Sequence, residues 1–168
     1  VITNADNATR VRVATLMQQD LAKIGIRLNI VPLDFRSLVD RISRTLDYET
    51  CLLSLVNLGP DPSDQMNLWL SSAAQHMWNP NQKMPATAWE AEIDRIMRAQ
   101  SEAADDKTRR GLVEKLQEIV WEQAPVIYLV NPHSLAAAGP RVRNVRAAAM
   151  TPRLLWSADQ IWLEGPSR

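Results

Sequence analysis

The chain has 168 residues, enough for one domain with a sizeable core, and its 19 basic and 19 acidic residues cancel to a formal net charge of zero. This balance, without a basic patch, argues against nucleic acid as a partner. No apolar run is long enough to span a bilayer, and the single cysteine, Cys51, cannot form an internal disulfide bond.

The first third of the chain begins with a strand end and an amphipathic helix. Apolar residues recur at three- and four-residue steps and form one stripe: Val11, Ala14, Met17, Leu21 and Ile24. Asp6 or Asn7 can cap the start of this helix by accepting backbone N–H bonds. Gly25 suits the left-handed position just past its end.

A strand, a second helix and a third strand are expected next. Ile26, Leu28 and Ile30 alternate with polar residues as in a half-buried strand, which we expect Pro32 to end. Asp34 is a plausible cap for a helix with four apolar positions: Leu38, Val39, Ile42 and Leu46. Residues 50–56 form an apolar run typical of a parallel strand buried on both faces. The pattern predicts an α/β fold with a mainly parallel sheet flanked by helices, joined by right-handed crossovers.

A turn-rich loop, Asn57 to Asp64, leaves the end of the third predicted strand. Ligands of open α/β sheets bind beyond the carboxyl ends of the strands, so this loop is the first place to look for a site. We expect a short helix over residues 66–70. Residues 71–85 then form a long irregular connection with Trp78 and Asn79 at its centre, and such loops are often functional.

The second half predicts a helix pair and an irregular end. Thr87 and Glu90 have capping-box spacing, and the helix they open carries Trp89, Ile93, Ile96 and Met97 on one side. A second helix begins at Asp105 or Asp106, carries Leu112, Val113, Leu116, Ile119 and Val120, and ends at Pro125. We expect the pair to be antiparallel and to cover the sheet. Residues 126–130 predict another buried strand, and residues 136–163 predict loops and short strands that rest on another surface.

Candidate catalytic and metal-binding residues are few. Asp61 and Asp64 could act as an acid–base pair or bind a metal with His76. The alternatives are ordinary turn chemistry in the loop or an Asp61 that faces a ligand. His76 and His133 lack metal-ligand spacing, which favours ordinary hydrogen-bonded or surface histidines. The chain has no nucleophile elbow, phosphate loop or dinucleotide fingerprint. The sequence therefore predicts no cofactor.

Trp78 beside Asn79 admits two interpretations. An exposed aromatic ring next to an amide can stack on a ligand and hydrogen-bond its backbone. The same tryptophan can equally plug the loop onto the core. Both interpretations stay open at the level of sequence.

The order of several phrases resembles one family. These are Leu21-Ala22-Lys23-Ile24-Gly25-Ile26, Asp61-Pro62, Trp78-Asn79, Glu92 to Met97, and Ala124-Pro125-Val126-Ile127-Tyr128-Leu129-Val130. Together they look like the second lobe and C-terminal part of a family 5 extracellular solute-binding protein of the dipeptide, oligopeptide and nickel group. The resemblance implies a periplasmic-binding-protein-like lobe, which captures a peptide or similar polar solute for the permease subunits of an ABC importer.

The resemblance also implies a domain organisation. Family members are longer and close two lobes over a ligand by hinge motion. Residues 1–168 would then be a single lobe without the N-terminal one, and residues 136–168 would return towards the missing lobe. Independently of the resemblance, we expect the start at Val1 to be an artificial or a processing boundary. The parent protein would be periplasmic or otherwise extracytoplasmic, with membrane anchoring as an option.

The resemblance places five ligand-binding residues at the cleft: Asn57, Leu58, Asp61, Trp78 and Asn79. Peptide-binding members carry an acidic residue shortly before the Asp-Pro step, which holds the amino terminus of the peptide. Residues 57–60 contain no acid. Either Asp61 substitutes for it, or the ligand is not a peptide with a free amine.

Solute capture without catalysis is the function we expect. One alternative is a fragment of an α/β hydrolytic enzyme that uses Asp61, Asp64 and His76. Another is a sensory or interaction domain derived from the binding fold.

Overall fold

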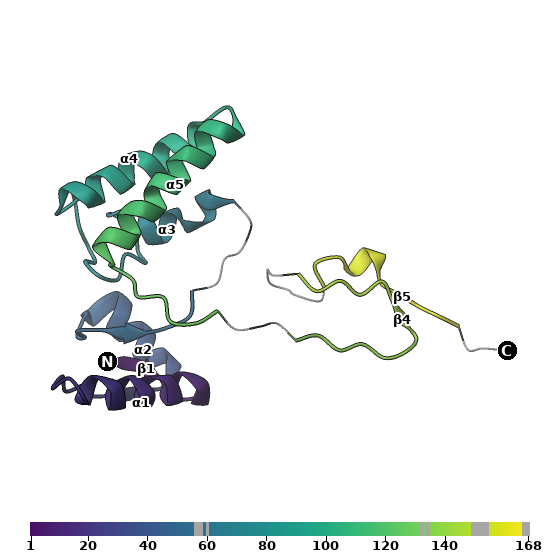
Figure 1. The fold of residues 1–168 in the computed structure, drawn as a ribbon, viewed down its shortest axis with the longest axis horizontal. Coiled ribbons are helices and arrows are strands. Elements are labelled where there is room, and N and C mark those ends of the chain that lie inside the picture. The colour runs from purple at the N-terminus through teal and green to yellow at the C-terminus, as the bar shows by residue number, and fades with distance from the viewer. Residues whose placement is uncertain (56–58, 60, 132, 134, 149–154, 166–168) are drawn as a thin grey trace. The chain divides into compact units, whose positions relative to one another are not determined.

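The computed structural model describes residues 1–55, 59, 61–131, 133, 135–148 and 155–165 (Figure 1). The chain forms two compact units. The first contains residues Val1–Leu55 and Asn67–Arg95, and the second contains Val56–Met66 and Ile96–Arg168. Two helices, α3 (Met66–Trp69) and α4 (Ala88–Glu102), cross the boundary between them. The organisation of residues 1–168 as a single lobe stays a prediction.

The first unit contains a small parallel sheet. Its order is β2-β1-β3, with β1 at Ile2–Asn4, β2 at Val31–Leu33 and β3 at Cys51–Leu52. Ile2 pairs with Val31 on one side and with Cys51 on the other, parallel in both cases. The expected α/β class with a parallel sheet is confirmed.

Helices connect these strands. α1 spans Ala8–Ala22, α2 spans Phe35–Asp40, and a π-helical turn at Arg41–Thr45 follows α2. The buried hydrophobic residues of this part are Ile2, Ala14 and Leu38. These three side chains come from β1, α1 and α2, so the core lies where the two helices meet the sheet.

The predicted caps of these helices are confirmed. The Asn7 side chain accepts a hydrogen bond from the Arg10 N–H at 3.0 Å, and Asp34 accepts one from Ser37 at the same distance. Gly25 has a φ of +80°, a conformation that costs glycine little.

The predicted second strand is wrong in position. The strand forms at residues 31–33, not 26–30, and Pro32 lies inside it instead of ending it. The N–H of Val31 bonds to Val1 and the carbonyl of Leu33 accepts from Ala5. Backbone groups of successive strand residues face opposite edges, so the nitrogen of Pro32 faces the edge away from β1, where no N–H is required.

The predicted third strand is shorter and less buried than expected. Only Cys51 and Leu52 pair with β1, both are half-buried, and Leu55 is 45% exposed. β1 offers only three residues for pairing, so the apolar run cannot continue as a ladder. Residue 56, the last of the predicted strand, lies outside the described residues. Burial raises the pKa of the unpaired Cys51 thiol.

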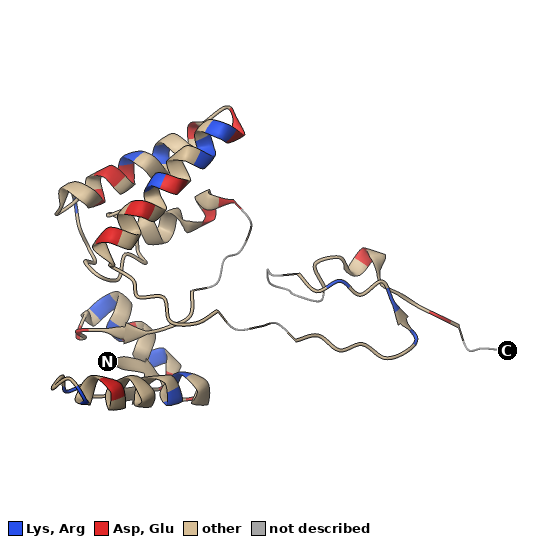
Figure 2. Cartoon of the chain, viewed as in Figure 1, with Lys and Arg blue, Asp and Glu red and all other residues tan. Residues whose placement is uncertain are grey.

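In the second unit, a 3₁₀ turn spans Pro62–Gln65 and α5 spans Asp106–Gln123. Asp105 caps α5 by accepting from the Thr108 N–H at 2.8 Å, and Ala124 ends it with a φ of 45°. Gln100 in the last turns of α4 accepts from Arg109 of α5 at 3.0 Å. Acidic and basic residues are interspersed along α4 and α5 (Figure 2). That the helix pair covers the sheet stays a prediction.

The predicted strand at residues 126–130 is wrong. These residues belong to no strand, and Ile127 and Val130 are 76% and 78% exposed. An apolar run becomes a strand only where another edge offers hydrogen bonds, and in the described part of the chain none is paired with it. The short strands expected further on are present as an antiparallel pair, β4 (Val142–Arg143) and β5 (Trp162–Leu163), with a 3₁₀ turn at Ala158–Gln160.

Candidate functional site

The loop of residues 71–87 in the first unit carries Trp78 and Asn79, and α4 anchors its end. Glu90 Oε2 accepts hydrogen bonds from the N–H and the hydroxyl of Thr87, both at 2.9 Å, and the Glu90 N–H donates back to Thr87 Oγ1 at 3.2 Å. This reciprocal arrangement is the predicted capping box. It fixes the point where the loop enters the helix.

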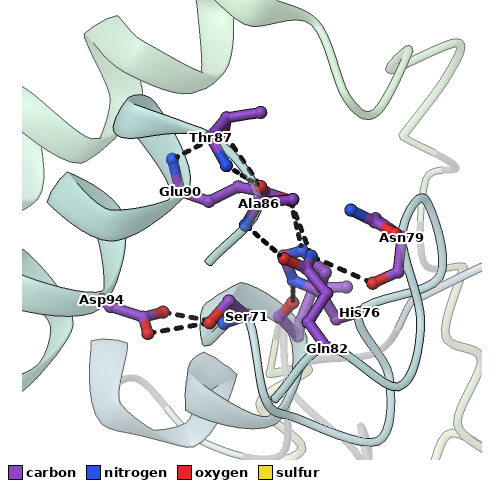
Figure 3. A network of polar contacts seen from close by, with 9 residues as sticks. Ser71, His76, Asn79, Gln82, Ala86, Thr87, Glu90 and Asp94 are labelled. Atoms are coloured by element: carbon purple, nitrogen blue, oxygen red, sulfur yellow. Dashed lines mark hydrogen bonds and ion pairs between the residues drawn. The ribbon is translucent and has the colours of Figure 1, made fainter. Parts of the chain in front are cut away.

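The other oxygen of Glu90 ties the interior of the loop to the same helix (Figure 3). Glu90 Oε1 accepts from His76 Nε2 at 3.1 Å and from Gln82 Nε2 at 2.8 Å. Gln82 also donates to the Asn79 carbonyl at 3.0 Å and accepts from the Ala86 N–H at 2.7 Å. Through Gln82, the buried Glu90 carboxylate therefore positions the backbone at both Asn79 and Ala86.

Hydrogen bonds determine the charge of this carboxylate. Burial by itself would raise the pKa of Glu90, but the bonds from His76, Gln82 and Thr87 outweigh burial and lower it. Glu90 is therefore ionised at neutral pH although it is only 2% exposed.

Trp78 packs against the rings of Trp69 and His76. Its ring centroid lies 5.8 Å from that of Trp69 and 3.9 Å from that of His76. Its indole Nε1 is buried and has no hydrogen-bond partner among the described residues. The contacts agree with a ring that closes the loop onto the core.

Asp61 belongs to the second unit, where its own carboxylate organises the start of the 3₁₀ turn. Asp61 Oδ1 accepts from the Ser63 N–H at 2.8 Å and from Arg109 Nη2 of α5. Ser63 Oγ is in turn 3.2 Å from Arg109 Nη2 and 3.0 Å from Gln100 Nε2. The bond from Ser63 and the ion pair with Arg109 lower the pKa of Asp61. The side chain is still 46% exposed.

The structure places the predicted site residues in two groups. Trp78 and Asn79 share the loop of the first unit, and Asp61 lies in the second unit. Asn57 and Leu58 lie outside the described residues. The role of all five as ligand-binding residues stays a prediction.

The predicted metal alternative lacks support from geometry. Both ring nitrogens of His76 are already bonded within the first unit, to Leu68 and Glu90. Among the residues that the structure describes, no group of three or more His, Cys, Asp or Glu side chains could hold a metal ion.

Sequence reasoning missed the network around Glu90. Its capping-box spacing revealed one role of Glu90, with Thr87. The contacts with His76 and Gln82 had no local signal, because a loop of irregular backbone separates these residues from the helix.

Comparison with known proteins finds relatives of this chain among peptide-binding proteins. It is 34% identical over 119 residues, 71% of its length, to Di/tripeptide-binding protein 4 of Pseudomonas aeruginosa. It is 28% identical over 142 residues, 84% of its length, to Di/tripeptide-binding protein 2 of the same organism. The chain is a relative of solute-binding proteins. It spans 21% and 26% of the length of these two relatives, and no protein-family model matches it.

A solved structure agrees with this relationship. The ABC transporter substrate-binding protein CtaP of Listeria monocytogenes matches 73% of the chain and 24% of its own length, with a TM-score of 0.64 and 25% identity. The resemblance to solute-binding proteins of peptide-type ABC importers is thus confirmed from both sequence and fold. In the described part of the chain itself, no helix is long and apolar enough to cross a membrane.

Proposed function

We propose that this chain is part of the extracytoplasmic binding component of an ABC importer. It captures a peptide or similar polar solute and delivers it to the permease subunits. The observation that carries the proposal is the 34% identity to a di/tripeptide-binding protein over 71% of the chain. The named relatives are binding proteins, and we propose that this protein, too, binds its solute without turning it over.

We propose ligand contacts within each unit, taken by itself. Trp78 offers an aromatic face and an unpaired indole N–H, and Asn79 follows it in a backbone held by Gln82. Asp61 offers a partly exposed carboxylate. Asn57 and Leu58 complete the proposed set. Rigid support of such groups lowers the entropy lost when a ligand binds.

The pairing of Asp61 bears on which solutes fit. Its Oδ1 already accepts from Arg109 and Ser63, so a ligand amine would share the carboxylate with a guanidinium. This sharing weakens the attraction for a free amino terminus relative to an unpaired acid. We therefore include polar solutes without an amine in the proposed substrate class.

The proposal includes partners for the apolar end of the chain. Trp156, Trp162 and Leu163 are 50%, 55% and 68% exposed, more apolar surface than a free tail usually presents. We propose that residues 136–168 return towards a first lobe, which supplies the other half of the ligand contacts. The enzyme alternative gains no support, because His76 is bonded elsewhere.

A ligand screen on the intact protein tests the proposal. Thermal unfolding is measured with di- and tripeptides, their N-acetylated forms, and a panel of polar metabolites. A solute at 100 times its Kd should stabilise the folded state by about 2.7 kcal/mol. Acetylated peptides that bind as well as free ones would show that no amine is required. Absence of stabilisation by every solute in the panel would overturn the proposal.

A further inference from the structure

His76 is a buried titratable side chain whose two ring nitrogens both face oxygen atoms. Nδ1 lies 3.2 Å from the Leu68 carbonyl oxygen, and Nε2 lies 3.1 Å from Glu90 Oε1. The side chains of His76 and Glu90 are 0% and 1% exposed. A carbonyl oxygen and an ionised carboxylate only accept hydrogen bonds. Both contacts are therefore satisfied together only when each ring nitrogen carries a proton, which is the imidazolium.

The partner carboxylate has no proton to share. Four donors occupy its two oxygens: His76 Nε2, Gln82 Nε2, Thr87 N and Thr87 Oγ1. The lowered pKa of Glu90 agrees with an ionised group. A buried charge of this kind needs a counter-charge, and the imidazolium supplies it.

The other groups near the imidazole do not replace this pairing. Asp94, one turn further along α4, binds the N–H and hydroxyl of Ser71. Lys83 in the loop is exposed. The Trp78 ring lies against the imidazole with a centroid separation of 3.9 Å, and an aromatic face attracts a cation. Glu90 is the charged side chain that contacts His76 in the described part of the chain.

We propose that His76 is a proton-dependent clamp on the loop of residues 71–87. Its imidazolium ties the Leu68 carbonyl of α3 to Glu90 of α4, and the chain between these two points is the loop. Loss of either ring proton leaves a nitrogen lone pair facing an oxygen lone pair, so one of the two hydrogen bonds, to Leu68 or to Glu90, is lost. The loop is held while both ring nitrogens carry protons and is released when one of them is lost. This inference concerns the loop itself and does not depend on solute binding.

Two measurements on the intact protein test the clamp between about pH 5 and pH 8, the range in which ordinary histidine side chains change charge. Nitrogen-15 NMR of the imidazole reports whether one or both ring nitrogens are protonated. Hydrogen exchange, corrected for its intrinsic pH dependence, reports opening of the loop. The amides of Met77 and Asn79, which bond within the loop, are the ones to follow.

The expected result is an imidazolium at the acid end whose loss accompanies faster loop exchange. The increase should be at least about tenfold, the size expected from one hydrogen bond to a charged group. His76→Gln should abolish this pH dependence. His133→Gln removes the other histidine, which is exposed, and should preserve it.

Two results would overturn the clamp. One is a neutral imidazole with a single tautomer across the whole range while the loop stays protected. The other is loop exchange that does not follow the titration of His76. Because both are read from the unmodified protein, the test holds even if the His76→Gln variant does not fold.

Discussion

The Asp94 carboxylate of α4 accepts hydrogen bonds from both the N–H and the hydroxyl of Ser71, at 2.7 and 2.9 Å. Both residues are buried, with 4% and 1% exposure. Asp94→Ala would leave two buried donors unpaired, so we expect it to lower the free energy of unfolding by about 2–3 kcal/mol. Chemical denaturation measures this loss. Glu92→Ala, which removes a surface pair with Arg95, is the control and should cost less than about 1 kcal/mol. Equal losses in the two variants would contradict the prediction.

Glu90 gives the fold a specific sensitivity to acid. Its folded-state pKa lies below the ordinary value of 4.5, so the unfolded chain takes up the proton more readily. The stabilisation is fully present above about pH 4.5 and is lost as pH falls through the folded-state pKa. We expect the melting temperature of the wild type to drop in this acid range. Glu90→Gln should be less stable at neutral pH, by about 1.5–3 kcal/mol, and should show a flatter acid dependence. A variant with an unchanged acid profile would disprove the assignment.

The cap of α5 depends on a side-chain acceptor rather than on charge. Asp105 accepts from the Thr108 N–H at 2.8 Å, and asparagine offers an equivalent oxygen. Asp105→Ala should lower the melting temperature, and Asp105→Asn should retain most of the stability. Asp106→Ala, at the next position, should have a smaller effect than Asp105→Ala because it removes only a charge near the helix start. If Asp105→Asn destabilised as much as Asp105→Ala, charge would matter more than the cap.

Trp78→Phe separates packing from ligand contact. Phenylalanine retains an aromatic ring against Trp69 and His76 but lacks the buried, unpaired Nε1 donor. If a solute accepts from that donor, its affinity should fall about fivefold, since a neutral hydrogen bond contributes about 1 kcal/mol. Calorimetry measures the affinity, with the solute found in the screen. Trp121→Phe, at a side chain that is 86% exposed, is the control. Unchanged affinity with reduced stability would assign Trp78 to packing.

Arg109 holds the turn that carries Asp61. It donates to Asp61 and to Ser63, and its Nε bonds to Gln100. Arg109→Gln should speed hydrogen exchange of the Asp64 amide, which bonds to the Asp61 carbonyl at 3.0 Å. We expect an increase of several-fold, as for a partly exposed ion pair of about 1 kcal/mol. The neighbouring exposed residue gives the control, Arg110→Gln, which should leave this exchange unchanged. A similar increase in both variants would refute a specific role for Arg109.

Much of the fold was predictable because the signals are local. Asn7, Asp34, Asp105 and the Thr87–Glu90 pair each satisfy backbone groups within three residues. Such caps are encoded in short stretches, so their spacing reveals them. The parallel sheet followed from helices between strands, since a helix crossover returns the chain in the same direction.

The errors concern strands, and they share one cause. Alternation at residues 26–30 and the apolar run at 126–130 both described strands that do not form. A strand exists only where a neighbouring edge accepts its hydrogen bonds, and the choice of 31–33 as the partner of β1 is a long-range event. A hydrophobic pattern indicates that a segment is suited to a sheet. It does not indicate which of its residues pair with a neighbouring strand.

The candidate site divides in the same way. Turn residues, the Trp78–Asn79 pair and the order of the family-like phrases were visible in the amino-acid order, and they led to a solute-binding relative. The pairing of His76 with Glu90, of Ser71 with Asp94, and of Asp61 with Arg109 appeared only in three dimensions. These partners are 14, 23 and 48 residues apart. Folding brings them into contact because a buried or partly buried polar group must find its partner wherever the chain supplies one.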